Sequence, residues 1–318
     1  MSKTDWYDLE SALRAQETFS DLFFKSRDMT DKQKQEMLKT FALSLHSEVT
    51  GIADGVSYKE HRLQDVPVDH QKILYKSVDA YRYILAILNL WGFEAHEFVM
   101  ALRQKDEFLH YRHELAQKKW SGQPVVLFDM DDVLADFRAL FCKYCTTRTG
   151  HPFDPLSKEY YNVSEFKALG LNSESFFRDF IDNQHGFLGL TPNLAYVMLF
   201  KTLQAEGYWM QIVTARPEKN LVALYDTFSW LKMYDIHADG VAFTPEKFVW
   251  LTDQPFYDSG RYVAIDDSAK HAAEYAKHGV RCVVPKLNYN AEVSDLPNVF
   301  YAEDAKHAYE AIKIWLPV

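Results

Sequence analysis

The chain contains few cysteines, and their number and spacing restrict what they can do. Only Cys142, Cys145 and Cys282 occur among 318 residues, and so small and odd a number does not predict a disulfide framework. Cys142 and Cys145 form a C-x-x-C pair inside FRALFCKYC, which is predicted to be helical, and no second Cys or His pair follows at zinc spacing. We therefore interpret the three thiols as structural, and expect a reducing, cytoplasmic setting.

The sequence also lacks long apolar runs and an excess of positive charge. No stretch of about 18 apolar residues is present, which argues against a membrane span. The opening MSKTDWYDLESALR has no signal-peptide core. The net charge is −10 and no basic face is evident, so an extended nucleic-acid duplex is not expected as a partner. A small anionic ligand is compatible with this charge if a metal ion and local Lys or Arg side chains neutralise it.

The chain divides into two parts with different patterns. Residues 1–119 show apolar positions at spacings of three and four with almost no β-type alternation, which predicts helices throughout. Asp31 and Asp69 are typical of helix starts. The polar segment HELAQKKWSGQP follows, so we predict an all-α domain over residues 1–120 and a second domain over 121–318.

After Pro124, short apolar runs alternate with helical stretches. The predicted strands are VVLFD (125–129), WMQIVT (209–214), GVAFT (240–244), YVAID (262–266) and RCVVP (281–285). This alternation predicts an α/β fold, a Rossmann-like parallel sheet with helices on both faces. In such sheets ligands bind beyond the carboxyl ends of the strands.

Polar residues stand at three of these strand ends. Asp129 and Asp131 follow the first strand, Thr214 ends the second, and Asp266 and Asp267 follow the fourth. Like charges crowded at the end of buried strands repel one another, so a bound cation is expected to offset the cost. Hard oxygen ligands with room for water and phosphate suit Mg²⁺, for which Asp129, Asp131, Asp266 and Asp267 are the candidate ligands.

The same cluster predicts phosphoryl chemistry. Asp129 can attack phosphorus and form an aspartyl-phosphate, while Asp131 can protonate the leaving alkoxide and later deprotonate water. The backbone N–H groups after Asp129, starting with that of Met130, are candidates to bind phosphate oxygens. The Thr214 hydroxyl and a lysine ammonium would hold the remaining oxygens.

These motifs resemble those of the haloacid dehalogenase-like phosphohydrolases. DMDDVLAD resembles their first motif, IVTARP their second and VAIDD their fourth; Lys247 in FTPEK is the preferred candidate for the third, ahead of Lys219 and Lys232. Over roughly residues 123–292, and including the late VPKLNYN with Asn288 and Asn290, the chain is most similar to the 5′(3′)-deoxyribonucleotidases. One departure is Asp132, where that family usually has Gly, so its carboxylate is expected to point away from the phosphate.

The resemblance implies specific roles. Asp129 is the expected nucleophile and metal ligand, Asp131 the acid/base that ligates metal through its carbonyl, Asp266 a direct metal ligand with Asp267 nearby, and Thr214 and Lys247 phosphate ligands. An insert of about residues 138–190 is expected to form a small helical cap that excludes water. Phe137 and Arg216 are candidate substrate contacts. Further cap aromatics could stack a base: Phe141, Tyr160, Tyr161, Phe166, Phe176, Phe177 and Phe187.

The predicted helical domain is similar, more distantly, to the all-α nucleoside-triphosphate pyrophosphohydrolases of the MazG and dimeric dUTPase group. That family holds Mg²⁺ with E-x-x-E on one helix and E-x-x-D on the next. Here the pairs read Glu48 with Gly51 and Lys76 with Asp79, so half of the carboxylates are missing and Glu48 and Asp79 form at most a vestigial metal site.

Several interpretations stay open at this stage. The helical domain is either a decayed module kept for homo-oligomerisation, a nucleotide-binding regulatory module, or an active pyrophosphohydrolase. The second domain is expected to be a Mg²⁺-dependent phosphatase of (deoxy)nucleoside 5′-monophosphates. The alternatives are a phosphatase for another small ester, such as a sugar phosphate, and a non-catalytic nucleotide sensor.

Overall fold

The computed structural model describes residues 8–56, 67–157, 159, 162–257 and 260–318. The chain forms two compact units, Met1–Arg103 and Gln104–Val318, which we call the helical unit and the sheet unit. Each is described separately below.

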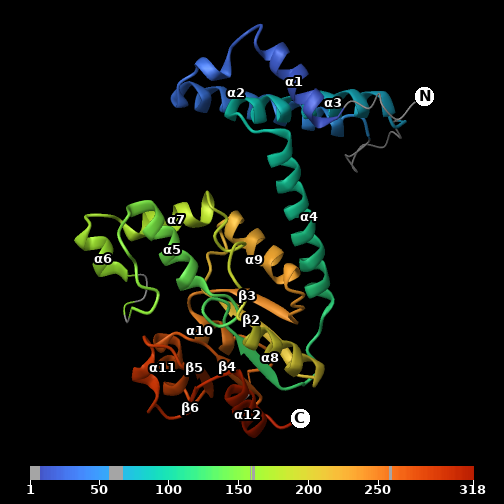
Figure 1. Cartoon of the computed structure of the whole chain (residues 1–318). Coiled ribbons are helices and arrows are strands. Elements are labelled where there is room, and N and C mark those ends of the chain that lie inside the picture. The colour runs from blue at the N-terminus through green and yellow to red at the C-terminus, as the bar shows by residue number, and fades with distance from the viewer. Residues whose placement is uncertain (1–7, 57–66, 158, 160–161, 258–259) are drawn as a thin grey trace. The chain divides into compact units, whose positions relative to one another are not determined.

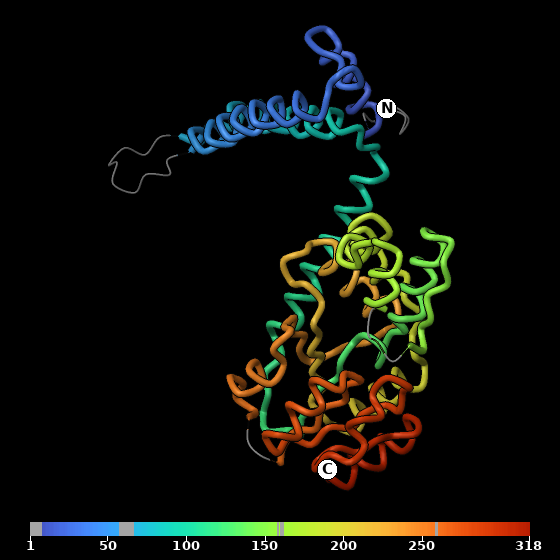
Figure 2. Tube along the Cα trace, turned by 90° about the vertical axis from the view of Figure 1, so that its left-hand side faces the viewer, coloured from blue at the N-terminus to red at the C-terminus, as the bar shows by residue number. Residues whose placement is uncertain are grey.

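The helical unit is built from α1 (Leu9–Ser20), η1 (Ser26–Asp28), α2 (Asp31–Ala53), α3 (His70–Trp91) and the first turns of α4 (Ala95–Gln117). Figure 2 shows α2 and α3 lying side by side along their length. The starts predicted from sequence have a physical basis, because Thr30 and Gln33 form a capping box before α2 and the Asp69 carboxylate accepts from the Lys72 backbone N–H at 2.9 Å. Gly92, at φ +73°, ends α3 in the left-handed conformation that glycine adopts readily.

The two units meet between Arg103 and Gln104, whereas the sequence prediction placed the domain boundary near residue 120. The difference lies in α4, whose later turns belong to the sheet unit. Phe108 and Tyr111 are buried there, each with its ring centroid 5.1 Å from that of Phe228. The polar segment after residue 117 is therefore a turn inside the sheet unit, which a composition change alone cannot distinguish from a linker.

The sheet unit contains six parallel strands in the order β3-β2-β1-β4-β5-β6. The strands are β1 (Val125–Phe128), β2 (Trp209–Thr214), β3 (Gly240–Phe243), β4 (Tyr262–Ile265), β5 (Cys282–Pro285) and β6 (Val299–Ala302). Five of them were predicted from sequence. The sixth, β6, was missed, and it lies at the edge of the sheet where three of its four residues are only partly buried.

Alternate strand residues pack against opposite faces of the sheet, as the pleat requires. Val126 and Phe128 join a core cluster with α8 (Leu194–Ala205), α9 (Leu221–Met233) and α12 (Ala305–Trp315), while Val125 and Leu127 join a second cluster with α10 (Lys247–Thr252) and α11 (Ala269–Lys277). A short η3 (Ala291–Val293) follows β5. This three-layer arrangement, visible in Figure 1, is the α/β fold predicted from the sequence.

The insert between β1 and β2 is helical, as predicted for the cap. Its first part, which corresponds to the predicted cap, carries α5 (Phe137–Thr149), α6 (Val163–Ala168) and α7 (Ser173–Asp182), and α8 follows before β2. Aromatic rings hold these helices together: Phe141 lies 5.3 Å from Phe180 and 6.0 Å from Phe177 between ring centroids. Tyr160 and Tyr161, two of the predicted base-stacking candidates, lie outside the described residues.

The three cysteines are free and buried. Burial raises the pKa of the Cys142 thiol to about 11 and that of the Cys145 thiol to about 12. This agrees with the structural role inferred from sequence. In the described part of the chain, no single helix has the length and apolar character to span a membrane, and α3 with α4 meets that test only as a pair bent by 117°.

Candidate active site

The carboxyl ends of three neighbouring strands bring the predicted site residues together. β1 lies between β2 and β4, so Asp129 directly after β1, Thr214 at the end of β2 and Asp266 directly after β4 share one edge of the sheet. The Asp129 backbone N–H continues the ladder by donating to the Ile265 carbonyl at 2.9 Å. β1 (VVLF) and β4 (YVAI) carry no charged side chain, and the carboxylates appear directly after each of these strands ends.

Three buried carboxylates form the centre of the site. Asp129, Asp266 and Asp267 each place an oxygen within 4.8 Å of the others, and their exposed fractions are 9%, 1% and 2%. Lys247 lies between two of them, with Nζ 2.8 Å from Asp129 Oδ1 and 2.7 Å from Asp266 Oδ2. One ammonium against three carboxylates leaves an excess of two negative charges in a buried space, a costly arrangement unless a further cation binds.

The pKa values of the three carboxylates show which of them has the least compensating positive charge. Burial raises the pKa of Asp129 to about 6, because the neighbouring carboxylates add to the cost and Lys247 offsets it only in part. Burial acts on Asp266 too, but Lys247 and His271 outweigh it and lower its pKa to about 2. Burial, together with the charges of Asp129 and Asp132, raises the pKa of Asp267 well above its ordinary value. Asp267 is therefore the least compensated of the three carboxylates.

The loop after β5 fixes Asp267. Tyr289 donates its hydroxyl to Asp267 Oδ2, and Asn290 donates to the Asp267 carbonyl at 2.9 Å. Asn290 is fully buried and also binds the Pro285 carbonyl, so it ties this loop to the end of β4. The sequence comparison had singled out Asn288 and Asn290, and the structure gives Asn290 this supporting position.

Asp266 is held by its own helix. Its Oδ1 accepts from the Ser268 backbone N–H at 3.0 Å, and its Oδ2 lies 3.4 Å from His271 Nδ1 in the first turn of α11. His271 is only 8% exposed and lines the cavity described next, yet the sequence analysis did not identify it. Its position five residues after Asp266, at the start of a helix, was the available signal.

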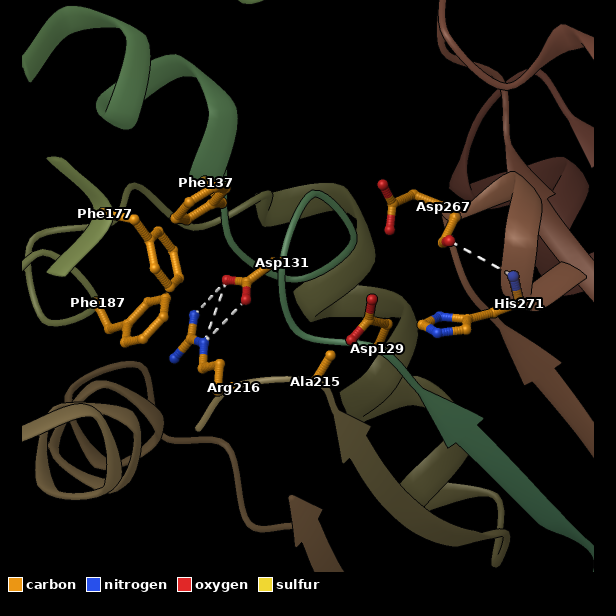
Figure 3. A pocket seen from close by; sticks show the side chains of 10 residues that line it. Asp129, Asp131, Phe137, Phe177, Phe187, Ala215, Arg216, Asp267 and His271 are labelled. Atoms are coloured by element: carbon orange, nitrogen blue, oxygen red, sulfur yellow. Dashed lines mark hydrogen bonds and ion pairs between the residues drawn. The ribbon is translucent and has the colours of Figure 1, made fainter. Parts of the chain in front are cut away.

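A cavity of about 130 Å³ opens between the acidic residues and the cap. Ten residues line it: Asp129, Asp131, Phe137, Phe177, Phe187, Ala215, Arg216, Asp267, Ser268 and His271. Figure 3 shows an aromatic end, with three phenylalanines, and an acidic end near Asp267 and His271. Asp131 lies between the two ends. A ligand that fits must therefore combine a charged group with an apolar or aromatic one.

Asp131 is bound by Arg216. Nη2 of Arg216 lies 2.6 Å from Asp131 Oδ1, and Nε lies 3.2 and 3.1 Å from the two carboxylate oxygens. Arg216 was predicted as a substrate contact. It lines the cavity, but its side chain is fully buried and its charge is directed at Asp131.

The remaining predicted phosphate ligands already have partners. The Met130 N–H donates to Asp129 Oδ1 at 2.7 Å, and the Thr214 hydroxyl accepts from the Arg216 N–H at 3.3 Å. Lys247 bridges Asp129 and Asp266. All three residues are buried, but they differ in donor capacity. The Met130 N–H would have to exchange its partner to bind an anion, whereas the Thr214 hydroxyl accepts in its bond to Arg216 and the Lys247 ammonium has a third N–H.

Asp132 has the orientation expected from its departure from the family pattern. It adopts φ +58°, a conformation that suits glycine, and its Oδ1 accepts from the Arg138 backbone N–H at 3.0 Å. It lines a separate cavity of about 210 Å³ together with Arg138 and Tyr289, not the one beside Asp129. Its side chain therefore leaves the acidic end of the first cavity clear.

The donor set fits a divalent cation. Buried, crowded carboxylate oxygens with an uncompensated negative charge are the ligands that Mg²⁺ prefers. Asp129, Asp266 and Asp267 are the residues that could hold the ion, and among the described ion pairs Lys247 contacts Asp129 and Asp266 but not Asp267. Asp131, the fourth predicted ligand, pairs with Arg216 instead.

In the helical unit, a lysine side chain lies at the second predicted metal site. Lys76 Nζ lies 2.7 Å from Glu48 Oε2 and 3.9 Å from Asp79 Oδ2. Gly51 supplies no carboxylate, and a Cβ there would lie 3.1 Å from Lys76 Cδ. The ammonium thus takes the place that a metal ion would need, and the residues do not fit a divalent cation.

No protein-family model and no curated protein matches the chain. Solved structures with a similar fold include a haloacid dehalogenase-like hydrolase from Streptococcus pneumoniae, at 15% identity and a TM-score of 0.45, covering 61% of this chain and 100% of that one. A predicted phosphoglycolate phosphatase from Haemophilus somnus has 16% identity and a TM-score of 0.45, with coverage of 62% and 99%. An HAD family hydrolase from Deinococcus radiodurans, solved with phosphate and sodium, has 15% identity and a TM-score of 0.42, with coverage of 62% and 99%. Because these identities and TM-scores are low, we base the function on the geometry of the site itself.

Proposed function

We propose that the sheet unit is a phosphomonoester hydrolase of the haloacid dehalogenase type. The observation that supports this best is the arrangement around Asp129. It stands at the end of the central strand, beside the buried Lys247, with Asp131 two residues later in the same cavity. A nucleophile, a second carboxylate for proton transfer and a cationic group in one small space are the parts that phosphoryl transfer requires.

The chemistry divides between the two carboxylates. An Asp129 oxygen attacks phosphorus while the bond from phosphorus to the ester oxygen breaks, and Asp131 gives its proton to the departing oxygen. Water then attacks phosphorus of the aspartyl-phosphate while Asp131 takes up a proton from it, and the bond from phosphorus to the Asp129 oxygen breaks; inorganic phosphate leaves and both side chains are restored. A divalent cation held by Asp129 and Asp267 would supply positive charge to the phosphoryl oxygens. Lys247 holds Asp129 in position throughout.

For the substrate, we propose a nucleoside monophosphate. The aromatic end of the cavity is formed by Phe137, Phe177 and Phe187, all from the segment between β1 and β2. Flat aromatic faces next to a phosphate-binding end favour a ligand with a planar ring and one phosphate. A sugar phosphate would leave these rings without a stacking partner.

The test is a panel of monophosphates assayed with and without Mg²⁺. We expect deoxynucleoside 5′-monophosphates to be hydrolysed fastest, and chelation to abolish turnover. Asp129→Asn should remove activity while the melting temperature stays near that of the wild type. Asp253→Asn, a change at an exposed carboxylate at the end of α10, is the matched control and should leave activity intact.

The outcomes separate the alternatives. Equal rates on sugar phosphates would refute nucleotide preference but retain the hydrolase. No turnover of any ester with Mg²⁺, combined with nucleotide binding, would favour the sensor. Asp131→Asn removes the base that activates water, so hydrolysis of the aspartyl-phosphate should slow more than its formation. Mass spectrometry of this variant after mixing with substrate should therefore detect one phosphoryl group on Asp129.

A second candidate function belongs to the helical unit, and a specific cavity supports it. About 620 Å³ of space lies beside Glu48 and Asp79, lined also by Phe19, Phe41 and Tyr83. We propose that this cavity binds a nucleotide without a metal ion, because Lys76 lies between Glu48 and Asp79 and neutralises one of their two negative charges. Arg82 also lines it, and in the described residues its guanidinium has no carboxylate partner, so it is available to an anionic group.

Calorimetric titration with deoxynucleotides in the presence of a chelator tests this role. Binding that survives chelation and is weakened by Arg82→Gln, but not by Arg103→Gln, would support it. The absence of binding would leave oligomerisation as the remaining role for this unit. Pyrophosphate release from triphosphates would instead identify an active pyrophosphohydrolase.

A further inference from the structure

Arg216 forms an ion pair with Asp131 that the scheme above does not use. Its side chain is fully buried, whereas that of Asp131 is 17% exposed. Two of its nitrogens, Nε and Nη2, bind the Asp131 carboxylate. This two-point contact fixes the orientation of the carboxylate plane as well as its position, which a single lysine contact would not.

Arg216 is itself held on two further sides. Its Nη1 donates to the Thr227 hydroxyl of α9 at 3.0 Å, and Thr227 in turn donates to the Ala223 carbonyl at 2.6 Å. The guanidinium lies over the Phe187 ring at 4.1 Å from its centroid. The guanidinium is therefore fixed by a helix of the sheet unit and by an aromatic ring of the cavity wall.

The Arg216–Asp131 pair lies where a proton donor to the departing oxygen is needed. Asp131 lies between the acidic end and the aromatic end of the cavity, where the bond between phosphorus and the organic part of a bound ester would be (Figure 3). When Asp131 is protonated, its Oδ1 can still accept from Nε and Nη2 of Arg216 while Oδ2 carries the proton, and this oxygen must face the junction. Free rotation about its side-chain bonds would direct it there only part of the time.

We propose that Arg216 is a positioning residue, which holds Asp131 toward the departing oxygen and makes the enzyme effective on esters with poor leaving groups. This inference rests on the proposed phosphatase activity. It also predicts that Arg216 acts through Asp131 and contributes little to substrate affinity.

The experiment compares two esters in the full-length protein with Mg²⁺. An aryl ester such as p-nitrophenyl phosphate releases a stable oxyanion and has little need of a proton donor, whereas an alkyl ester such as a deoxynucleoside 5′-monophosphate requires one. kcat/KM is the quantity to measure, because it reports the steps up to and including ester cleavage and not the later hydrolysis of the phosphoenzyme.

We expect Arg216→Met to lower kcat/KM on the alkyl ester by roughly 10²-fold, the usual size of a general-acid contribution, and on the aryl ester far less. Arg216→Lys should give a smaller loss with the same selectivity. Added guanidinium ion should restore part of the alkyl-ester activity to Arg216→Gly.

The controls separate this role from others. Arg178→Met alters an exposed arginine of α7 that pairs with Glu174, and should leave both activities unchanged. Equal losses on both esters, or a change confined to KM, would overturn the positioning role and indicate a structural or substrate-contact role. Wild-type protein that hydrolyses neither ester would refute the phosphatase proposal itself, an outcome distinct from failure of this inference.

Discussion

Asp132 is a residue at which local geometry and charge conflict. Its backbone adopts φ +58°, where residues other than glycine are strained, although Asp and Asn tolerate this region better than most. One carboxylate oxygen binds the Arg138 backbone N–H, and the other is buried with no hydrogen-bond partner in the described residues. Burial raises the pKa of Asp132 to about 7, so its ionised form is costly in the folded protein.

We expect Asp132→Asn to stabilise the protein at pH 8. Asn keeps the acceptor for Arg138 and tolerates positive φ, but carries no charge. The pKa of Asp132 in the folded protein lies above the ordinary 3.8. The contribution of Asp132 to the free energy of unfolding is therefore fully present below about pH 4 and is lost as the pH rises through about 7. The advantage of the variant should therefore grow over this range and reach about 1 kcal/mol or more. Urea unfolding at pH 5 and pH 8 with a chelator measures it; an equal or larger advantage at pH 5 would contradict the explanation.

At this scale, the sequence predicted the charged residues of the site better than their partners. Asp129, Asp131 and the Asp266–Asp267 pair were predicted because they follow apolar strands, whereas Lys247 was chosen through the resemblance to a family motif. That Arg216 binds Asp131, and that His271 lies against Asp266, depends on side-chain directions across different elements, which no local pattern encodes.

In the cap, the backbone at Gly186 packs closely against the aromatic ring of Phe180, and we expect this contact to affect the stability of the cap. A Cβ built on Gly186 would lie 2.2 Å from Cε1 of Phe180, which is buried in the aromatic cluster of α5 and α7. Gly189, three residues later, has room, since a Cβ there would lie 3.5 Å from Leu140. The two glycines thus form a matched pair in the same segment.

Gly186→Ala should destabilise the protein by about 1–3 kcal/mol, because Phe180 must move within a packed cluster. Gly189→Ala should be close to neutral. Chemical denaturation followed by tyrosine and tryptophan fluorescence makes the comparison. Similar losses in both variants would show that the cluster is not the cause.

Strands and cap helices were predicted because their patterns are long and regular. The edge strand β6 was missed although its four residues, VFYA, form an apolar run as long as that of β1; β3, whose four residues are all partly buried, was predicted, so neither length nor burial explains the difference. Val, Phe and Tyr favour a strand, and the pairing with β5 adds a non-local contact that stabilises it.

For the whole molecule, the position of the unit boundary has a direct test. A fragment of residues 104–318 keeps Phe108 and Tyr111 in the core, whereas a fragment of residues 121–318 removes both. Loss of a buried aromatic side chain costs about 3–5 kcal/mol, so the shorter fragment should be largely unfolded and the longer one folded and active. Circular dichroism and phosphatase assays distinguish them, and equal stability would restore the boundary near 120.

The helical unit exposes apolar side chains that a second copy of the chain could cover. On α2 and α3 these are Leu43, Val49, Leu74, Tyr75, Val78 and Tyr81. We propose that the protein forms a homo-oligomer through these helices. Light scattering should give a mass of at least two chains, and Leu43→Glu with Leu74→Glu should reduce it to one. A monomeric wild type would exclude this role.

The buried thiols can be used to detect local opening of the structure by chemical labelling. Cys142 and Cys145 are on α5 of the cap, and Cys282 begins β5 inside the sheet, so each part carries its own thiol. A thiol reagent can modify each one only when the surrounding structure separates, because burial holds it in the unreactive protonated form. The order in which the three sites become labelled would reveal whether the cap can open while the sheet stays intact.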